Sequence, residues 1–190
     1  MTKHSVPAAV LAMLAVFPLW ASPTTAPATA PATAPATAPA SDEAEVDSWD
    51  VSRLGRTRLG EVWSGPRVGP ADLRGKVVLL EFWGYNCPPC IRSMPHLGQL
   101  QDRHGRDGLV VIGAHVGASA KDEALAVVRR TGVAYTIVSM ALVPEVRLTH
   151  IPQALVFDGG GTLLYQGAPD EQMDQAVAQA LASRPHPANE

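Results

Sequence analysis

Continuous apolar runs after residue 76 predict buried strands. The segment Val-Val-Leu-Leu-Glu-Phe-Trp at 77–83 is almost entirely apolar, which is typical of a strand covered on both faces of a sheet. Residues 109–116 form a second run of the same kind. Shorter strands are predicted at 135–138, 153–157 and 162–166. The three glycines between the last two favour a β-hairpin.

Segments with helical periodicity lie between these runs. Residues 87–104 carry an apolar side chain at every third position, and Gly105 can end the helix. The apolar positions are Ile91, Met94, Leu97 and Leu100. The pattern also predicts helices at 120–131 and 170–182 and a helical turn at 143–148. Strand–helix–strand order followed by hairpin and helix predicts an α/β fold, with a central mixed β-sheet flanked by helices.

The chain before residue 49 has a different character. Residues 1–21 combine a short basic start with an apolar run of roughly 15 residues, the proportions of a secretory signal. The same segment could stay uncleaved as a membrane anchor, although a comfortable span needs ~20 residues. In residues 22–48, Thr-Ala-Pro-Ala repeats four times and then an acidic lead-in follows. The repeat is either an extended spacer on the order of 50 Å long or a low-complexity expansion without a role.

Length and composition limit the possible classes of protein. The remaining chain is long enough for one domain, predicted at 49–183 with a short tail at 184–190. Net charge is -3 without a long basic run, which argues against nucleic acid as a partner. Two cysteines cannot fill a four-ligand zinc site, and histidines such as His96 or His115 show no recognisable ligand spacing. We therefore expect no metal.

The chemistry concentrates in Cys87-Pro88-Pro89-Cys90, between a predicted strand and a predicted helix. At the start of a helix, the free N–H groups and the helix dipole stabilise a thiolate, so Cys87 is the expected nucleophile. Cys90 stands one turn later, where it can resolve a mixed disulfide. Pro88 and Pro89 suit the first helical turn, whose N–H groups have no intrahelical acceptor. The pair itself would be the redox centre, without a dissociable cofactor. A purely structural disulfide is the alternative.

Several motifs resemble one known family. Asp72-Leu73-Arg74-Gly75-Lys76 and the run at 77–83, followed by the cysteine pair, are similar to the exported TlpA/ResA-like thiol–disulfide oxidoreductases of the thioredoxin-fold superfamily. Met94-Pro95 matches the proline that kinks the active-site helix in that family. His150-Ile151-Pro152 resembles its cis-proline loop, and X–Pro bonds are where cis peptides occur. The resemblance extends over 72–166 and implies a thioredoxin fold.

The resemblance also implies roles for individual residues. Glu81, six residues before Cys87, matches a buried carboxylate that handles protons for the second cysteine, and burial would raise its pKa. The alternative is a residue at a strand edge, with its carboxylate in water or on an arginine. Trp83 is expected to pack beneath the site. The implied substrate groove consists of Trp83, Pro88, Pro89, Ile151 and Pro152.

Three positions depart from the family pattern. Ser93 replaces a glutamate common three residues after the second cysteine, Gln153 replaces the threonine after the cis-proline, and Asn86 replaces a tryptophan. These departures weaken the case for apocytochrome c as the partner. His96, His104 and His115 are interpreted as surface or packing residues.

The function expected from these observations is a thiol–disulfide oxidoreductase, with reductase favoured over oxidase. Its substrates would be protein thiols and disulfides in the periplasm or another extracytoplasmic compartment. A membrane electron donor such as a DsbD-type thiol reductase would keep it reduced, and residues 1–21 could tether it. The enzymatic alternatives are a disulfide-donating oxidase or isomerase, or a thiol peroxidase, although Gly84 stands where peroxiredoxins carry threonine. The non-enzymatic alternative is a binding or chaperone module with a structural disulfide.

Overall fold

The apolar run at 77–83 forms the central strand of a six-stranded sheet. The structure is a computed structural model that describes residues 48–117 and 119–184. β3 (Val77–Trp83) pairs in parallel with β4 (Leu109–His115) along its whole length, and antiparallel with β7 (Gln153–Phe157) on its other side. The strand order is β2-β5-β4-β3-β7-β8, where β2 is Val62–Ser64, β5 is Thr136–Val138 and β8 is Leu163–Gly167. The sheet is therefore mixed, as predicted.

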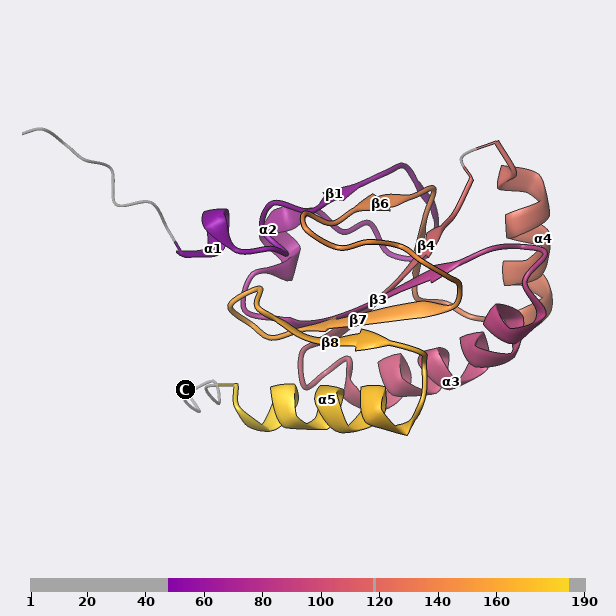
Figure 1. Ribbon diagram of the computed structural model, residues 1–190. Helices are drawn as coiled ribbons and strands as arrows, with labels where there is room; N and C mark the ends of the chain where they lie inside the picture. The colour runs from indigo at the N-terminus through magenta and orange to yellow at the C-terminus, as the bar shows by residue number, and fades with distance from the viewer. Residues whose placement is uncertain (1–47, 118, 185–190) are drawn as a thin grey trace, which may run out of the picture. The chain divides into compact units, whose positions relative to one another are not determined.

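Further elements cover the two faces of this sheet (Figure 1). The helices are α1 (Ser48–Val51), α2 (Pro70–Leu73), α3 (Pro88–His104), α4 (Lys121–Thr131) and α5 (Glu171–Ala182). A separate two-stranded sheet pairs β1 (Arg58–Leu59) with β6 (Ala141–Leu142). In Figure 1, α3 and α5 lie on one side of the sheet, while α1, α2, β1 and β6 lie on the other.

Alternation along β3 divides the core between these two faces. Val77, Leu79 and Trp83 pack with the buried side chains of α3, α4 and α5. Val78, Leu80 and Phe82 pack on the opposite face, in a cluster that includes residues of α1 and α2. Every residue of β3 is buried, including Glu81, which by its position belongs to the face covered by α3. The strand that leads to the cysteine pair is thus fixed on both faces and along both edges.

The predicted strands and helices are present, apart from one. The prediction of a helical turn at 143–148 is wrong: Pro144 and Glu145 form a turn, and residues 146–148 are not helical. Glu145 has a φ of 61°, in the left-handed region that a right-handed helix cannot contain. Its carboxylate accepts from Arg56 Nη2 at 2.9 Å and from Arg53 Nε at 3.2 Å, two contacts that hold the turn. The short elements β1, β2, β6, α1 and α2 were not predicted.

Part of the sequence interpretation concerns residues that the structure does not describe. The expected signal or anchor at 1–21 and the repeat within 22–48 lie outside the described residues, as does most of the tail at 184–190. None of the described helices has the length and apolar character needed to cross a membrane.

Candidate active site

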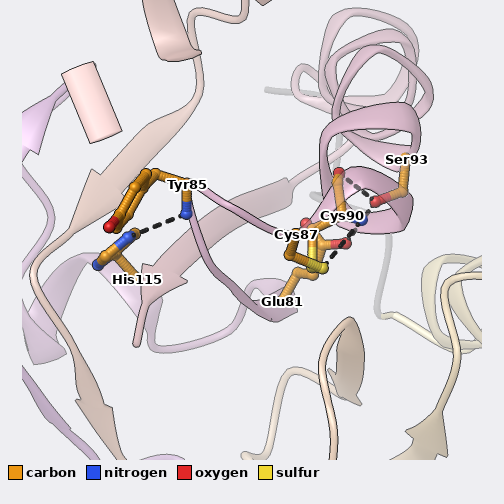
Figure 2. The surroundings of a disulfide bond; sticks show 6 residues. All are labelled: Glu81, Tyr85, Cys87, Cys90, Ser93 and His115. Carbon is orange, nitrogen blue, oxygen red and sulfur yellow. Dashed lines mark hydrogen bonds between the residues drawn. A yellow bond between two sulfur atoms is a disulfide. The ribbon is translucent and has the colours of Figure 1, made fainter. Parts of the chain in front are cut away.

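The cysteine pair lies where the central strand passes into the longest helix. β3 ends at Trp83, and Cys87 is the N-cap of α3 with extended backbone angles (φ −106°, ψ 96°). Pro88 and Pro89 occupy the first helical positions. The N–H of Cys90 donates to Cys87 Sγ at 3.3 Å (Figure 2). A negative charge on this sulfur would therefore meet a backbone donor and the positive end of the helix dipole.

The two cysteines form a disulfide and differ in their exposure to solvent. Cys87 and Cys90 are bonded to each other, with Cα atoms 5.3 Å apart. Cys87 keeps 8% of its surface exposed, whereas Cys90 is completely buried. A reactant arriving from solvent therefore reaches Cys87, and Cys90 can act only on a bond that Cys87 has already formed.

Glu81 lies beneath the pair as a buried carboxyl group (Figure 2). Burial raises its pKa to about 7, and the hydrogen bond from Ser93 offsets only part of that rise. Among the described residues, Glu81 Oε2 has no hydrogen-bond partner. Because β3 lies between β4 and β7, the alternative of a strand-edge carboxylate in water is excluded. A carboxyl group with a pKa near neutrality can both take up and release a proton.

Ser93 connects this carboxyl group to the backbone of the second cysteine. Its Oγ lies 2.6 Å from Glu81 Oε1 and 2.8 Å from the carbonyl oxygen of Cys90. A hydroxyl has one proton to donate, so both contacts are hydrogen bonds only when Glu81 is protonated and donates to Ser93. When Glu81 is ionised, the Ser93 proton turns to the carboxylate and the Cys90 carbonyl loses the Ser93 hydroxyl as a donor. The sequence offered no signal for this contact, and Ser93 stood out only as a departure from the family pattern.

His115 anchors the loop that precedes Cys87. The backbone N–H of Tyr85 donates to His115 Nε2 at 3.2 Å, and His115 Nδ1 lies 2.9 Å from the carbonyl oxygen of Gly117. The first contact needs an acceptor nitrogen and the second a donor, so the ring is neutral with its proton on Nδ1. Burial lowers the pKa of His115, in agreement with this assignment. The packing role expected from the sequence is present, but its contact with the active-site loop was not foreseen.

The ring of His115 also lies within a group of aromatic side chains. Tyr85 stacks on it with ring centres 5.9 Å apart, and Trp83 meets it edge-on at 5.0 Å. Trp63 from β2 completes the group at 5.4 Å. Trp83 is fully buried, so it supports the loop from beneath and does not line an accessible groove.

The loop before β7 lies against the active-site loop. The peptide bond between Ile151 and Pro152 is cis. A Cβ at Gly84 would lie 3.2 Å from Ile151 Cδ1, so the two loops are in close approach. Gln153 is buried, and its Nε2 donates to the carbonyl oxygen of Arg147 at 3.2 Å. Gln153, which stands where the family has threonine, thus holds the loop before β7 in place.

Two further histidines contact carboxylates away from this site. His96 Nε2 lies 2.9 Å from Asp174 Oδ1, and His104 Nδ1 lies 3.4 Å from Asp107 Oδ2. Within residues 48–117 and 119–184, the structure has no cluster of three or more His, Cys, Asp or Glu side chains that could hold a metal ion.

Comparison with known sequences identifies relatives of this chain. A profile of the AhpC/TSA family matches residues 61–164. The thiol-disulfide oxidoreductase ResA of Halalkalibacterium halodurans is 29% identical over 117 residues, which cover 57% of this chain and 64% of ResA. Protein DipZ of Mycobacterium tuberculosis is 48% identical over 44 residues, 23% of this chain and 6% of DipZ. The chain thus spans less than two thirds of the length of either relative.

Solved structures share its architecture. A thiol:disulfide interchange protein of the thioredoxin family from Chlorobium tepidum superposes with a TM-score of 0.56 at 24% identity, covering 66% of this chain and 93% of that chain. A secreted disulfide oxidoreductase of Mycobacterium tuberculosis gives 0.53 at 20% identity, covering 67% and 97%. These likenesses confirm the predicted thioredoxin fold. Because the family profile matches more than half of the chain, the protein belongs to the AhpC/TSA family.

Proposed function

We propose that the protein is a thiol–disulfide oxidoreductase that acts on protein disulfides outside the cytoplasm. One observation carries the proposal: a disulfide at a helix N-terminus leaves only its first cysteine partly exposed, above a buried carboxyl group with a pKa of about 7. Cys87, Cys90 and Glu81 are the proposed reacting groups. ResA, similar over 117 residues, is named as an enzyme of this kind.

In the reducing direction, the Cys87 thiolate attacks one sulfur of a substrate disulfide. A bond forms between Cys87 Sγ and that sulfur, and the other substrate sulfur leaves as a thiolate that takes a proton from solvent. The Cys90 thiol then gives its proton to the Glu81 carboxylate and attacks Cys87 Sγ. As the Cys87–Cys90 bond forms, the bond between Cys87 Sγ and the substrate breaks, and the second substrate sulfur leaves as a thiolate that takes a proton from solvent. The substrate thus gains the two electrons that the cysteine pair loses.

Turnover in this direction requires a donor of two electrons. We propose a membrane thiol reductase of the DsbD type as that donor, with the cysteine pair as the redox centre and no dissociable cofactor. The apolar segment at 1–21 supports export, and we propose that it tethers the protein if it is not cleaved. A solved relative from Mycobacterium tuberculosis is described as secreted, in keeping with an extracytoplasmic location.

The test is the reduction potential of the purified protein, measured by equilibration with thiol buffers. A value around −270 mV identifies a reductant, and one near about −120 mV an oxidant that donates its disulfide. A bond that is not reduced until well below roughly −300 mV is structural, and the enzymatic proposal fails. A peroxide-consumption assay on the reduced protein separates a thiol peroxidase from these outcomes.

A further inference from the structure

We propose that an apolar cleft beside the active-site loop binds an extended segment of the substrate protein, one that carries a large apolar side chain next to a carboxylate. This inference rests on the proposed function and names the kind of sequence that the enzyme selects. The cleft has a volume of about 620 Å³. Residues 140–144, residues 115–117 and the side chain of Arg58 supply much of its lining.

Exposed apolar side chains gather in this cleft. Met140, Leu142 and Leu148 line it and keep 41%, 57% and 44% of their surface exposed. They are three of the five large apolar side chains exposed within the described part of the chain. A fourth, Tyr85, stacks on His115, which is itself part of the lining. An apolar surface of this kind is the mark of a binding site.

The charge at the rim favours an acidic group in the occupant. Glu145 is held by Arg53 and Arg56, which keep the pKa of its carboxyl group low, so its charge is balanced. Arg58 has no ion pair with any residue that the structure describes, and it is exposed. A carboxylate that enters the cleft therefore meets an uncompensated guanidinium group.

The cleft adjoins the loop that carries the nucleophile. Phe82 and His115 lie in its wall, and His115 accepts the N–H of Tyr85, two residues before Cys87 (Figure 2). Val116, which also lines the cleft, approaches the same loop: its Cγ2 would lie 3.6 Å from a Cβ added at Gly84. A chain bound in the cleft can thus extend past the loop and bring a neighbouring cysteine to Cys87. Proteins that are not yet folded expose the apolar residues that this requires.

The experiment compares two cystine peptides that differ at one residue. Both contain a leucine beside the disulfide, and the residue next to this leucine is aspartate in the first peptide and lysine in the second. The readout is the ratio of kcat/KM for the acidic peptide to that for the basic peptide, measured with the full chain. We expect the ratio to fall at least tenfold in Arg58→Glu and to stay unchanged in Arg106→Glu, an exposed arginine outside the cleft.

A second pair of variants tests the apolar part. Leu142→Ser should weaken binding of the acidic peptide with its cysteines replaced by serine, measured by fluorescence anisotropy. Leu164→Ser, which changes an equally apolar exposed residue on β8, should not. Equal effects of the cleft variants and their controls would overturn the inference. So would a dimer in sedimentation that Leu142→Ser abolishes while peptide binding is unchanged, because the cleft would then bind a second copy.

The two proposals fail in different ways. If the wild-type protein reduces a small aromatic disulfide but shows no preference between the peptides, the function stands and the cleft inference is wrong. If it reduces neither small disulfides nor peptides, yet binds the acidic serine peptide in a manner that depends on Arg58 and Leu142, the cleft stands and the proposed activity is wrong.

Discussion

Replacing Glu81 by glutamine should change how the stability of the domain depends on pH. The folded protein holds the Glu81 proton up to a pKa of about 7, whereas the unfolded chain releases it near 4.5. Between these values the folded state binds more protons than the unfolded state, so the free energy of unfolding falls as pH rises. Glu81→Gln has no proton to lose at this position, and this part of the decline should disappear.

The magnitude follows from the two pKa values. Each unit of difference corresponds to about 1.36 kcal/mol, so the change from 4.5 to about 7 amounts to about 3 kcal/mol. At pH 4 the carboxyl group is protonated in both states and contributes almost nothing. By pH 8 it is ionised in both, and the full cost of burying the charge is present. The stability of Glu81→Gln relative to wild type should therefore rise by about 3 kcal/mol between pH 4 and pH 8.

The assay is urea unfolding of the oxidised proteins at several pH values in this range. The titration of His115 is common to both proteins and cancels in the difference. Asp102→Asn, which removes an exposed carboxylate from α3, is the matched control and should show no comparable slope. Ser93→Ala removes a hydrogen bond that lowers the pKa of Glu81, so it should move the decline to higher pH. A difference between wild type and Glu81→Gln that does not change with pH would refute the reasoning.

Three further predictions concern single side chains around the site. Cys90→Ser should accumulate a mixed disulfide with a cystine peptide through Cys87, detectable by mass spectrometry, and Cys87→Ser should form none, because only Cys87 is accessible. Gly113→Ala should lower the free energy of unfolding by about 1–3 kcal/mol, since its Cβ would lie 2.8 Å from a side-chain carbon of β5; an unchanged urea midpoint would contradict this. His115→Phe removes the acceptor of the Tyr85 N–H and should cost about 1–3 kcal/mol, whereas His115→Gln keeps an acceptor and should recover part of it in the same measurement.

Features set by neighbouring residues could be predicted from the sequence. The apolar run at 77–83 has to be a buried strand whatever surrounds it, and Cys87 before two prolines suits a helix start in any fold. Glu81 within that run indicated a buried carboxyl group before its surroundings were known. The position of Pro152 at the start of β7 followed in the same way from a proline before an apolar run.

Contacts between distant parts of the chain could not be predicted. Ser93 contacts Glu81, and His115 contacts Tyr85, because α3 and β4 pack against β3 and the loop that follows it. The periodicity of the sequence does not indicate such contacts. The segment 143–148 has residues compatible with a helix, but the pairing of β6 with β1 and the two arginines on Glu145 impose a turn. Tertiary contacts overrode the local pattern there.

The central position of β3 has a consequence for hydrogen exchange. From Val78 to Phe82 the strand is paired with β4 on one side and β7 on the other, so each of its amides can reach solvent only when an interior ladder of the sheet separates. Their exchange rates should report the global unfolding equilibrium, whereas the amides of 84–86, which lie outside the ladders, should exchange through local opening. The strand beneath the disulfide is in this sense an internal standard. Any change in protection that accompanies oxidation or reduction can be measured in the loop against a strand that opens only with the whole domain.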